Sequence, residues 1–182
     1  EDPLAPAASV TRSVSIGLSS AAAASGSWTL SGTRLRQTDS RQLYAKYAVP
    51  VRQSANELVY HFRGTGAPAG WSGYGMHFLA SNAGERDLYG YGSSYLVWVT
   101  RDPANTQSDH TFVQLYRSYD DVRMVQLASR AIDRPITSEF DVTVYVNRSE
   151  GTIVLGVDDE AVLTFEDPAI IRSGSEVVAR TL

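Results

Sequence analysis

The segment 139–167 constrains the fold of this chain more than any other part of the sequence. Apolar side chains stand at every second position in three successive runs, which begin at Phe140, Ile153 and Ala161. Alternation with a period of two is typical of a strand that buries one face. Turn clusters at 147–151 and 158–160 separate the runs, so the segment predicts a three-stranded antiparallel meander.

Short alternating runs separated by turns continue along most of the 182 residues, without a convincing long helix. We expect about twelve strands, from a first one over 12–18 to a last one over 177–182, while 43–49 also fits a helical period. Such a series is typical of an antiparallel sandwich or barrel. Because no linker and no repeat divide the chain, we expect a single domain over 1–182, with 1–11 as an extended N-terminal arm.

Composition narrows the class of partner. The formal net charge of −4 argues against nucleic acid and against an anionic membrane surface, and no apolar run is long enough to span a bilayer. The absence of Cys excludes zinc–thiolate sites and cysteine nucleophiles. A start at Glu1 without Met fits an exported, processed chain or a trimmed one. We expect a periplasmic or extracellular location, because acidic, Cys-free β domains are common there.

Three patterns along the chain carry a resemblance: the hairpin Ser27-Trp28-Thr29-Leu30 with Leu35-Arg36-Gln37, the meander with Val157-Asp158-Asp159, and the closing run Gly174-Ser175-Glu176-Val177-Val178. They are similar to patterns of the concanavalin-A-like lectin/glucanase superfamily, which includes laminin-G-like modules. Asp159 stands where that superfamily usually has Gly. The resemblance implies an all-β, antiparallel jelly-roll β-sandwich of two curved sheets, with ligands on the concave face or the rim loops. It covers lectins, glycosidases and structural domains alike, so it does not select a function.

The first hairpin has a predicted register. A two-residue turn at Ser31-Gly32 would pair Trp28 with Leu35 on one face.

Aromatic residues interleaved with glycines are the strongest candidate ligand platform. They lie between the Gly/Pro loop 64–72 and the strand predicted at 94–101. Aromatic faces in Gly-rich loops suit the C–H faces of sugar rings. Several of these residues also fit a buried sheet position, which is the competing interpretation. The residues we expect to stack on a ligand are Trp71, Tyr89, Tyr91 and Trp98.

His61 and His77 each stand opposite the apolar face of a predicted strand, and Arg63 follows the first of them. If these two strands paired as a hairpin, the imidazoles would be diagonal neighbours. Two His without a carboxylate as third ligand make a poor metal site, so we expect no metal here. We expect His61, His77 and Arg63 to make polar contacts to the ligand instead.

Two further features bear on metals and catalysis. Asp102, Asn105, Asp109 and His110 share one loop whose oxygens suit Ca²⁺, but their spacing matches no EF-hand, so we predict no cofactor and leave Ca²⁺ as the alternative. Glu139 and Asp141 begin the E-x-D-x-x-E pattern that glucanases of the similar superfamily carry. Thr143 and Val144 stand where the second Glu would be, and hydrolysis needs both carboxyls. We therefore predict no catalytic residue.

The sequence favours a non-catalytic, exported jelly-roll domain that binds a glycan through loop and groove aromatics. The alternative is a structural or assembly subunit of a cell-surface or periplasmic structure that uses the same rings as a protein interface. A glycoside hydrolase is the third interpretation. The identity of the ligand and the oligomeric state cannot be read from these residues.

Overall fold

The computed structural model describes residues 25–32, 34–68, 70–81, 88–101, 104 and 110–182. Within these residues all regular elements are strands. They are β1 Trp28–Ser31, β2 Arg34–Gln37, β3 Ala45–Gln53, β4 Glu57–Gly64, β5 Gly73–Ala80, β6 Ser94–Arg101, β7 Thr111–Ser118, β8 Met124–Ile132, β9 Phe140–Asn147, β10 Thr152–Val157, β11 Glu160–Glu166 and β12 Gly174–Thr181.

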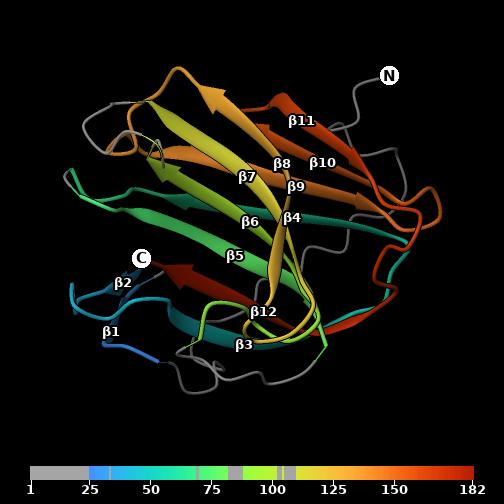
Figure 1. Ribbon diagram of the computed structural model, residues 1–182, viewed down its shortest axis with the longest axis horizontal. Helices are drawn as coiled ribbons and strands as arrows, with labels where there is room; N and C mark the ends of the chain where they lie inside the picture. The colour runs from blue at the N-terminus through green and yellow to red at the C-terminus, as the bar shows by residue number, and fades with distance from the viewer. Residues whose placement is uncertain (1–24, 33, 69, 82–87, 102–103, 105–109) are drawn as a thin grey trace.

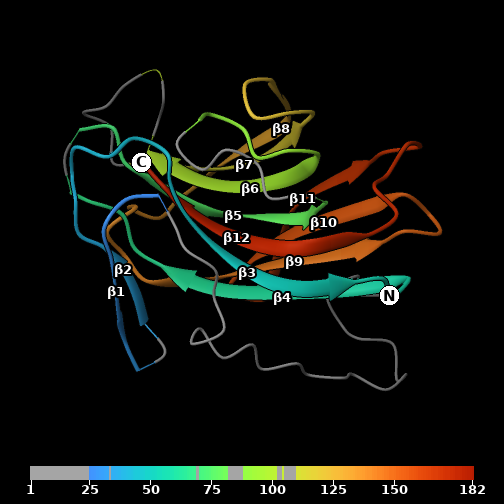
Figure 2. The same cartoon turned by 90° about the horizontal axis from the view of Figure 1, so that it is seen from below.

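The strands form two stacked antiparallel sheets and a separate hairpin (Figure 1). One sheet has six strands in the order β3-β12-β5-β6-β7-β8, and the other has four in the order β11-β10-β9-β4. Viewed from below, the two sheets lie as the layers of a sandwich, and β3 and β12 bend along their length (Figure 2). β1 and β2 make the hairpin. The fold is therefore the antiparallel jelly-roll β-sandwich that the sequence predicts.

The hydrophobic core lies between the two larger sheets, because each strand turns one apolar face inward. Buried Val142, Val144 and Leu155 of the four-stranded sheet face buried Phe78 and Val97 of the six-stranded sheet in one cluster. Apolar area removed from water stabilises the fold by about 25 cal/mol per Å². The meander predicted from 139–167 is confirmed as β9, β10 and β11.

The last strand takes an interior position, second from one edge of the six-stranded sheet. β12 pairs with β3 on one side and with β5 on the other, although these strands lie far from it in the sequence. β12 therefore brings the C-terminal residues between two strands from earlier in the chain. The outer face of that sheet, which points away from the core, is assembled from three distant parts of the chain.

Three details differ from the sequence prediction. The first hairpin pairs Trp28 with Gln37 and Leu30 with Leu35, because Gly32, at a φ of 59°, is the first residue of the turn. β4 does not pair with β5 but with β9, so His61 and His77 lie on different sheets. At a φ of 50°, Leu79 turns into the core, whereas the alternation of Gly73, Gly75 and His77 predicts the opposite face for it.

Other expected features fall outside the described residues. They are the N-terminal arm 1–11, the strand at 12–18 and most of the polar loop with Asp102, Asn105 and Asp109. The helical alternative for 43–49 is wrong, because β3 begins at Ala45. No helix of the described part of the chain is long and apolar enough to cross a membrane.

Candidate binding site on the outer face of the six-stranded sheet

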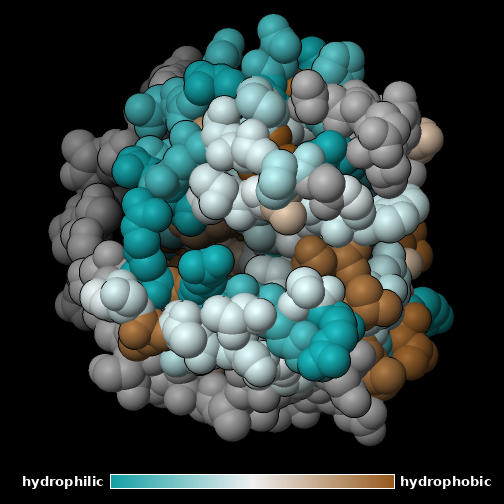
Figure 3. Space-filling view, turned by 90° about the vertical axis from the view of Figure 1, so that its left-hand side faces the viewer, coloured by the Kyte–Doolittle hydropathy of each residue, from teal (hydrophilic) through white to brown (hydrophobic). Residues whose placement is uncertain are grey.

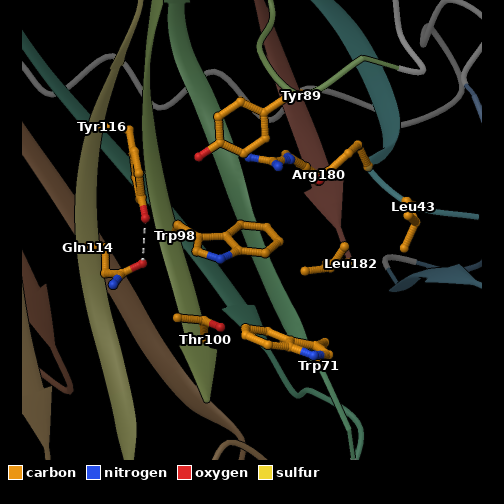
Figure 4. Close-up of a pocket in the computed structure, with 10 residues that line it drawn as sticks. Leu43, Trp71, Tyr89, Trp98, Thr100, Gln114, Tyr116, Arg180 and Leu182 are labelled. Carbon is orange, nitrogen blue, oxygen red and sulfur yellow. Dashed lines mark hydrogen bonds between the residues drawn. The ribbon is translucent and has the colours of Figure 1, made fainter. Parts of the chain in front are cut away.

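A pocket of about 410 Å³ opens on the outer face of the six-stranded sheet (Figure 4). This volume is within the range of sites for small molecules. Residues of the strands β6, β7 and β12, of the segments before β3, β5 and β6, and of the C-terminal end after β12 line it. They are Leu43, Tyr44, Trp71, Tyr89, Trp98, Thr100, Gln114, Tyr116, Arg180 and Leu182. Seen from the end where the C-terminus lies, the surface is hollowed and hydrophobic atoms gather beside the hollow (Figure 3).

The pairing register of β12, β5, β6 and β7 determines which side chains form the floor of this pocket. Arg180 of β12, Gly75 of β5, Trp98 of β6 and Gln114 of β7 are successive cross-strand partners, so they lie in one row across the sheet. Cross-strand partners point to the same face. Three of the four have side chains, and those of Trp98, Gln114 and Arg180 are all buried. The floor is therefore a fixed part of the sheet.

Two glycines let the Trp98 ring lie flat on β5. A Cβ added at Gly73 would overlap Cζ2 of Trp98, and one added at Gly75 would lie 3.0 Å from Cε3 and would overlap the carbonyl oxygen of Val97. Because both positions lack a side chain, the indole crosses β5 and meets Arg180 on β12. The centre of its ring lies 4.7 Å from Cζ of the guanidinium.

Arg180 is enclosed by aromatic rings. Its Cζ lies 5.0 Å from the ring centre of Tyr44 and 5.3 Å from that of Tyr89, and these two rings meet edge to face. Figure 4 shows the guanidinium between the rings of Tyr89 and Trp98. Burial lowers the pKa of Arg180 to about 10, so its charge is retained at neutral pH.

The rim of the pocket is exposed and is held by hydrogen bonds to the backbone. Trp71 is 65% exposed. It precedes Ser72, whose hydroxyl accepts from the amide of Ala67 at 2.7 Å. Arg101 holds the same loop, because its Nη2 donates to the carbonyls of Ala67 and Pro68. The rim ring of Trp71 therefore projects from an anchored loop.

Tyr89 is placed by a second set of backbone contacts. Lys46 Nζ donates to the carbonyl of Leu88, and the amide of Gly90 donates to the carbonyl of Asp121 at 2.6 Å. These bonds fix the residues on both sides of Tyr89. Polar groups complete the pocket, since the Tyr116 hydroxyl lies 3.0 Å from Oε1 of Gln114, and burial raises the pKa of Tyr116 to about 12.

The sequence-predicted ligand residues divide into three groups. Trp71, Tyr89 and Trp98 lie together at the pocket. Tyr91 and His77 lie on the same face of the sheet but are fully buried, and their ring centres are 5.7 Å apart with the ring planes tilted by 49°. His61 and Arg63 are exposed on β4 of the other sheet, where they bond to Thr143 and Asp141. The structure therefore does not bring these two residues to the pocket.

His77 has a structural role in this arrangement. The Ser94 hydroxyl donates to the carbonyl of Tyr91 at 2.9 Å, so it accepts a bond from Nδ1 of His77, also at 2.9 Å. Burial, and then the charges of Arg180 and Lys46, lower the pKa of His77 well below its usual value. The imidazole is therefore neutral beneath the outer face.

The acidic pair considered for catalysis is not among the residues that line the pocket, and it lies at the start of β9 in the four-stranded sheet. Glu139 pairs with Arg34 at 3.2 Å and Asp141 with Arg63 at 2.6 Å. The hydrogen bond from Arg63 lowers the pKa of Asp141. Both carboxylates are thus held in surface ion pairs. Within the described residues, no cluster of three His, Asp or Glu side chains could hold a metal.

Sequence reasoning missed Arg180, Gln114, Tyr116 and Tyr44. One signal was available for Arg180, because it alternates with Val178 and Leu182 and is the single charged residue among these three. A charge on an otherwise apolar strand face is a candidate functional residue. The row that joins it to Trp98 depends on strand order, which the alternation does not encode.

Comparison with solved structures identifies the fold. A carbohydrate-binding module of the CBM66 type from Bacillus subtilis superposes with a TM-score of 0.62 at 11% identity, covering 86% of each chain. The potassium-bound carbohydrate recognition domain of Emp46p gives 0.66 at 12% identity, over 90% of this chain and 81% of that one. A legume lectin-like domain from Entamoeba histolytica gives 0.61 at 8% identity, over 90% and 82%.

This fold is that of lectin-like jelly-roll domains. At 8% to 12% identity, the likeness shows the fold alone. No protein-family model matches the sequence, and no curated protein matches it either. The resemblance to the concanavalin-A-like superfamily is thereby supported at the level of architecture.

The contact between Trp98 and the glycines of β5 can be tested by paired substitutions. Gly73→Ala should lower the free energy of unfolding by about 1–3 kcal/mol, because its Cβ overlaps the indole. In a Trp98→Ala background most of this loss should disappear. Gly75→Ala is the matched control, because its Cβ overlaps backbone and should destabilise both backgrounds. Urea unfolding of the six proteins measures these differences, and equal losses for Gly73→Ala in both backgrounds would contradict the packing described.

Buried His77 should make the stability of the fold decrease as the pH falls below about 6.5. Because the pKa of His77 is lowered in the folded state, the unfolded chain takes up the proton first as the pH falls below 6.5. The stability that depends on neutral His77 is fully present above about pH 6.5 and is lost as the pH falls. The free energy of unfolding should decrease by at most about 1.4 kcal/mol per pH unit. Urea unfolding of His77→Gln should show a shallower slope. His61→Gln, at an exposed position, should keep the wild-type slope, and a steep slope in His77→Gln would refute this account.

Proposed function

We propose that this chain is a non-catalytic carbohydrate-binding domain and that the pocket on the outer face of the six-stranded sheet is its binding site. The observation that carries the proposal is the placement of rings around this pocket. Trp98 forms part of the floor, Tyr89 the wall, and Trp71 stands exposed at the rim. A sugar presents apolar C–H faces to such rings and hydroxyl groups to polar side chains.

Polar groups stand beside the rings. The Gln114 amide, the Thr100 hydroxyl and the Tyr116 hydroxyl all line the pocket. Amides and hydroxyls can donate and accept, so they match the mixed character of sugar hydroxyls. Glycoside hydrolysis instead needs two carboxyls across the bond, and the ten described lining residues are aromatic, aliphatic, amide, hydroxyl or guanidinium groups. This composition favours binding over hydrolysis.

The solved structures of the same fold add support. They include a carbohydrate-binding module and a carbohydrate recognition domain. Export to the periplasm or the cell exterior stays a prediction from composition, and so does the absence of a cofactor. A protein partner docking on the same rings is the competing function, and the binding experiment separates the two.

Glycan binding should depend on Trp71. A glycan array probed with the purified domain should give specific binding, and Trp71→Ala should weaken it by about tenfold or more, because one stacked ring is removed. The substitution should leave the fold intact, since Trp71 is 65% exposed. Tyr119→Ala is the matched control, because it removes an exposed ring outside the pocket and should bind like the wild type.

Two outcomes would count against this proposal. No specific glycan at high protein concentration would contradict it and favour a protein partner. Equal loss in Trp71→Ala and Tyr119→Ala would place the site elsewhere. Binding should also persist in EDTA, and loss in EDTA that Ca²⁺ restores would instead support the calcium loop around 102–110.

A further inference from the structure

Arg180 is a buried cation that the pocket exposes to a ligand. It is 3% exposed, yet it lines the pocket, and its guanidinium points into the space between Tyr89 and Trp98 (Figure 4). A buried charge is usually paired with an opposite charge or bound by several acceptors. The surroundings of Arg180 therefore indicate what it is placed to bind.

No acidic side chain among the described residues forms an ion pair with the guanidinium of Arg180. None of the ion pairs among the described residues includes Arg180, and its Nε is buried without a hydrogen-bond acceptor. The contacts of the guanidinium are with three aromatic rings. Rings attract a cation but accept no strong hydrogen bonds from its N–H groups. The guanidinium thus has no anionic partner in the described part of the chain, and it lines the pocket that a ligand would enter.

The lining of the pocket carries a positive charge despite the acidic composition of the chain. Arg180 is the single charged residue among the ten that line it. Lys46, which is its cross-strand partner on β3, is also buried, and both charges act on His77. Glu176 of the same strand is four residues away and accepts a bond from the Tyr91 hydroxyl. In a protein of net charge −4, this is a local site for an anion.

We propose that the ligand of this pocket is an acidic sugar whose carboxylate binds the guanidinium of Arg180. The inference rests on the proposed function and names its substrate class. A planar carboxylate matches the fork of a guanidinium with two parallel N–H···O bonds. One guanidinium balances the single charge of a carboxylate, whereas a doubly charged phosphate would leave charge uncompensated. The sugar ring would then stack on Trp71 or Tyr89, with its hydroxyls near Gln114.

The test compares each acidic sugar with its uncharged methyl ester. The probes are the methyl glycosides of glucuronic, galacturonic and N-acetylneuraminic acid, beside any carboxylated glycan that the array returns. Isothermal titration with wild-type protein should give at least about tenfold tighter binding to an acid than to its ester, the effect of charge-assisted bonds. This comparison needs no variant, so a folding defect cannot obscure it.

The variant Arg180→Gln tests whether the preference for the acid over its ester depends on Arg180. It should bind acid and ester alike, while Trp71→Ala should weaken both and keep their ratio. An acid preference that survives in folded Arg180→Gln would overturn the inference. So would tighter binding of neutral or sulfated glycans by the wild type, although the proposed function would stand. If no glycan of any class binds, both fail, and Arg180 serves only to cross-link the rings around it.

Discussion

The contact of the Trp98 indole with the bare backbone at Gly73 and Gly75 determines the shape of the outer face. Side chains at either glycine would lift the ring off β5, and the ring could not reach Arg180 on the next strand. With the ring flat, the guanidinium packs between Trp98 and Tyr89 and becomes part of the floor. The floor of the pocket follows from this close approach, whereas backbone hydrogen bonds place the wall at Tyr89 and the rim at Trp71.

The two outer faces of the sandwich differ in chemistry. On the four-stranded sheet, Arg63 and Asp141 form an ion pair at the surface, where both charges remain partly hydrated. On the six-stranded sheet, Arg180 is buried among rings, with the neutral His77 and the buried Lys46 nearby. A paired surface charge contributes little to binding, whereas a desolvated cation without an anionic partner binds an anion strongly. This difference is the reason for placing the proposed ligand site on the six-stranded sheet.

Much of the fold could be predicted from the sequence, because alternation reports which face of a strand is buried. The meander 139–167 is confirmed in the structure, and so are the strands around Tyr74 and Trp98. Alternation is silent on which strands are neighbours. The hairpin considered for the strands of His61 and His77 does not form, since β4 pairs with β9 and β12 inserts between β3 and β5.

The same limit decides which residues of the candidate site could be predicted from the sequence. Trp71, Tyr89 and Trp98 could be singled out because aromatic residues beside glycines are a local signal. Arg180 could not be joined to them, since it reaches the pocket only through the pairing of β12 with β5. Tyr91 shares the local signal with Tyr89, but its amide bonds to Ser118 and its ring is buried. Local sequence patterns indicate candidate aromatic residues, and the order of the strands in the sheet determines which of these residues lie together.

The most direct test of the pocket as a ligand site is an NMR titration of the three indole N–H signals with a bound glycan. We expect the signals of Trp71 and Trp98 to move with the same affinity. The signal of Trp28 should stay in place, because its Nε1 donates to the carbonyl of Ser25 outside the pocket lining. Movement of Trp28 alone, or of no indole while the glycan binds, would contradict the assignment of this pocket.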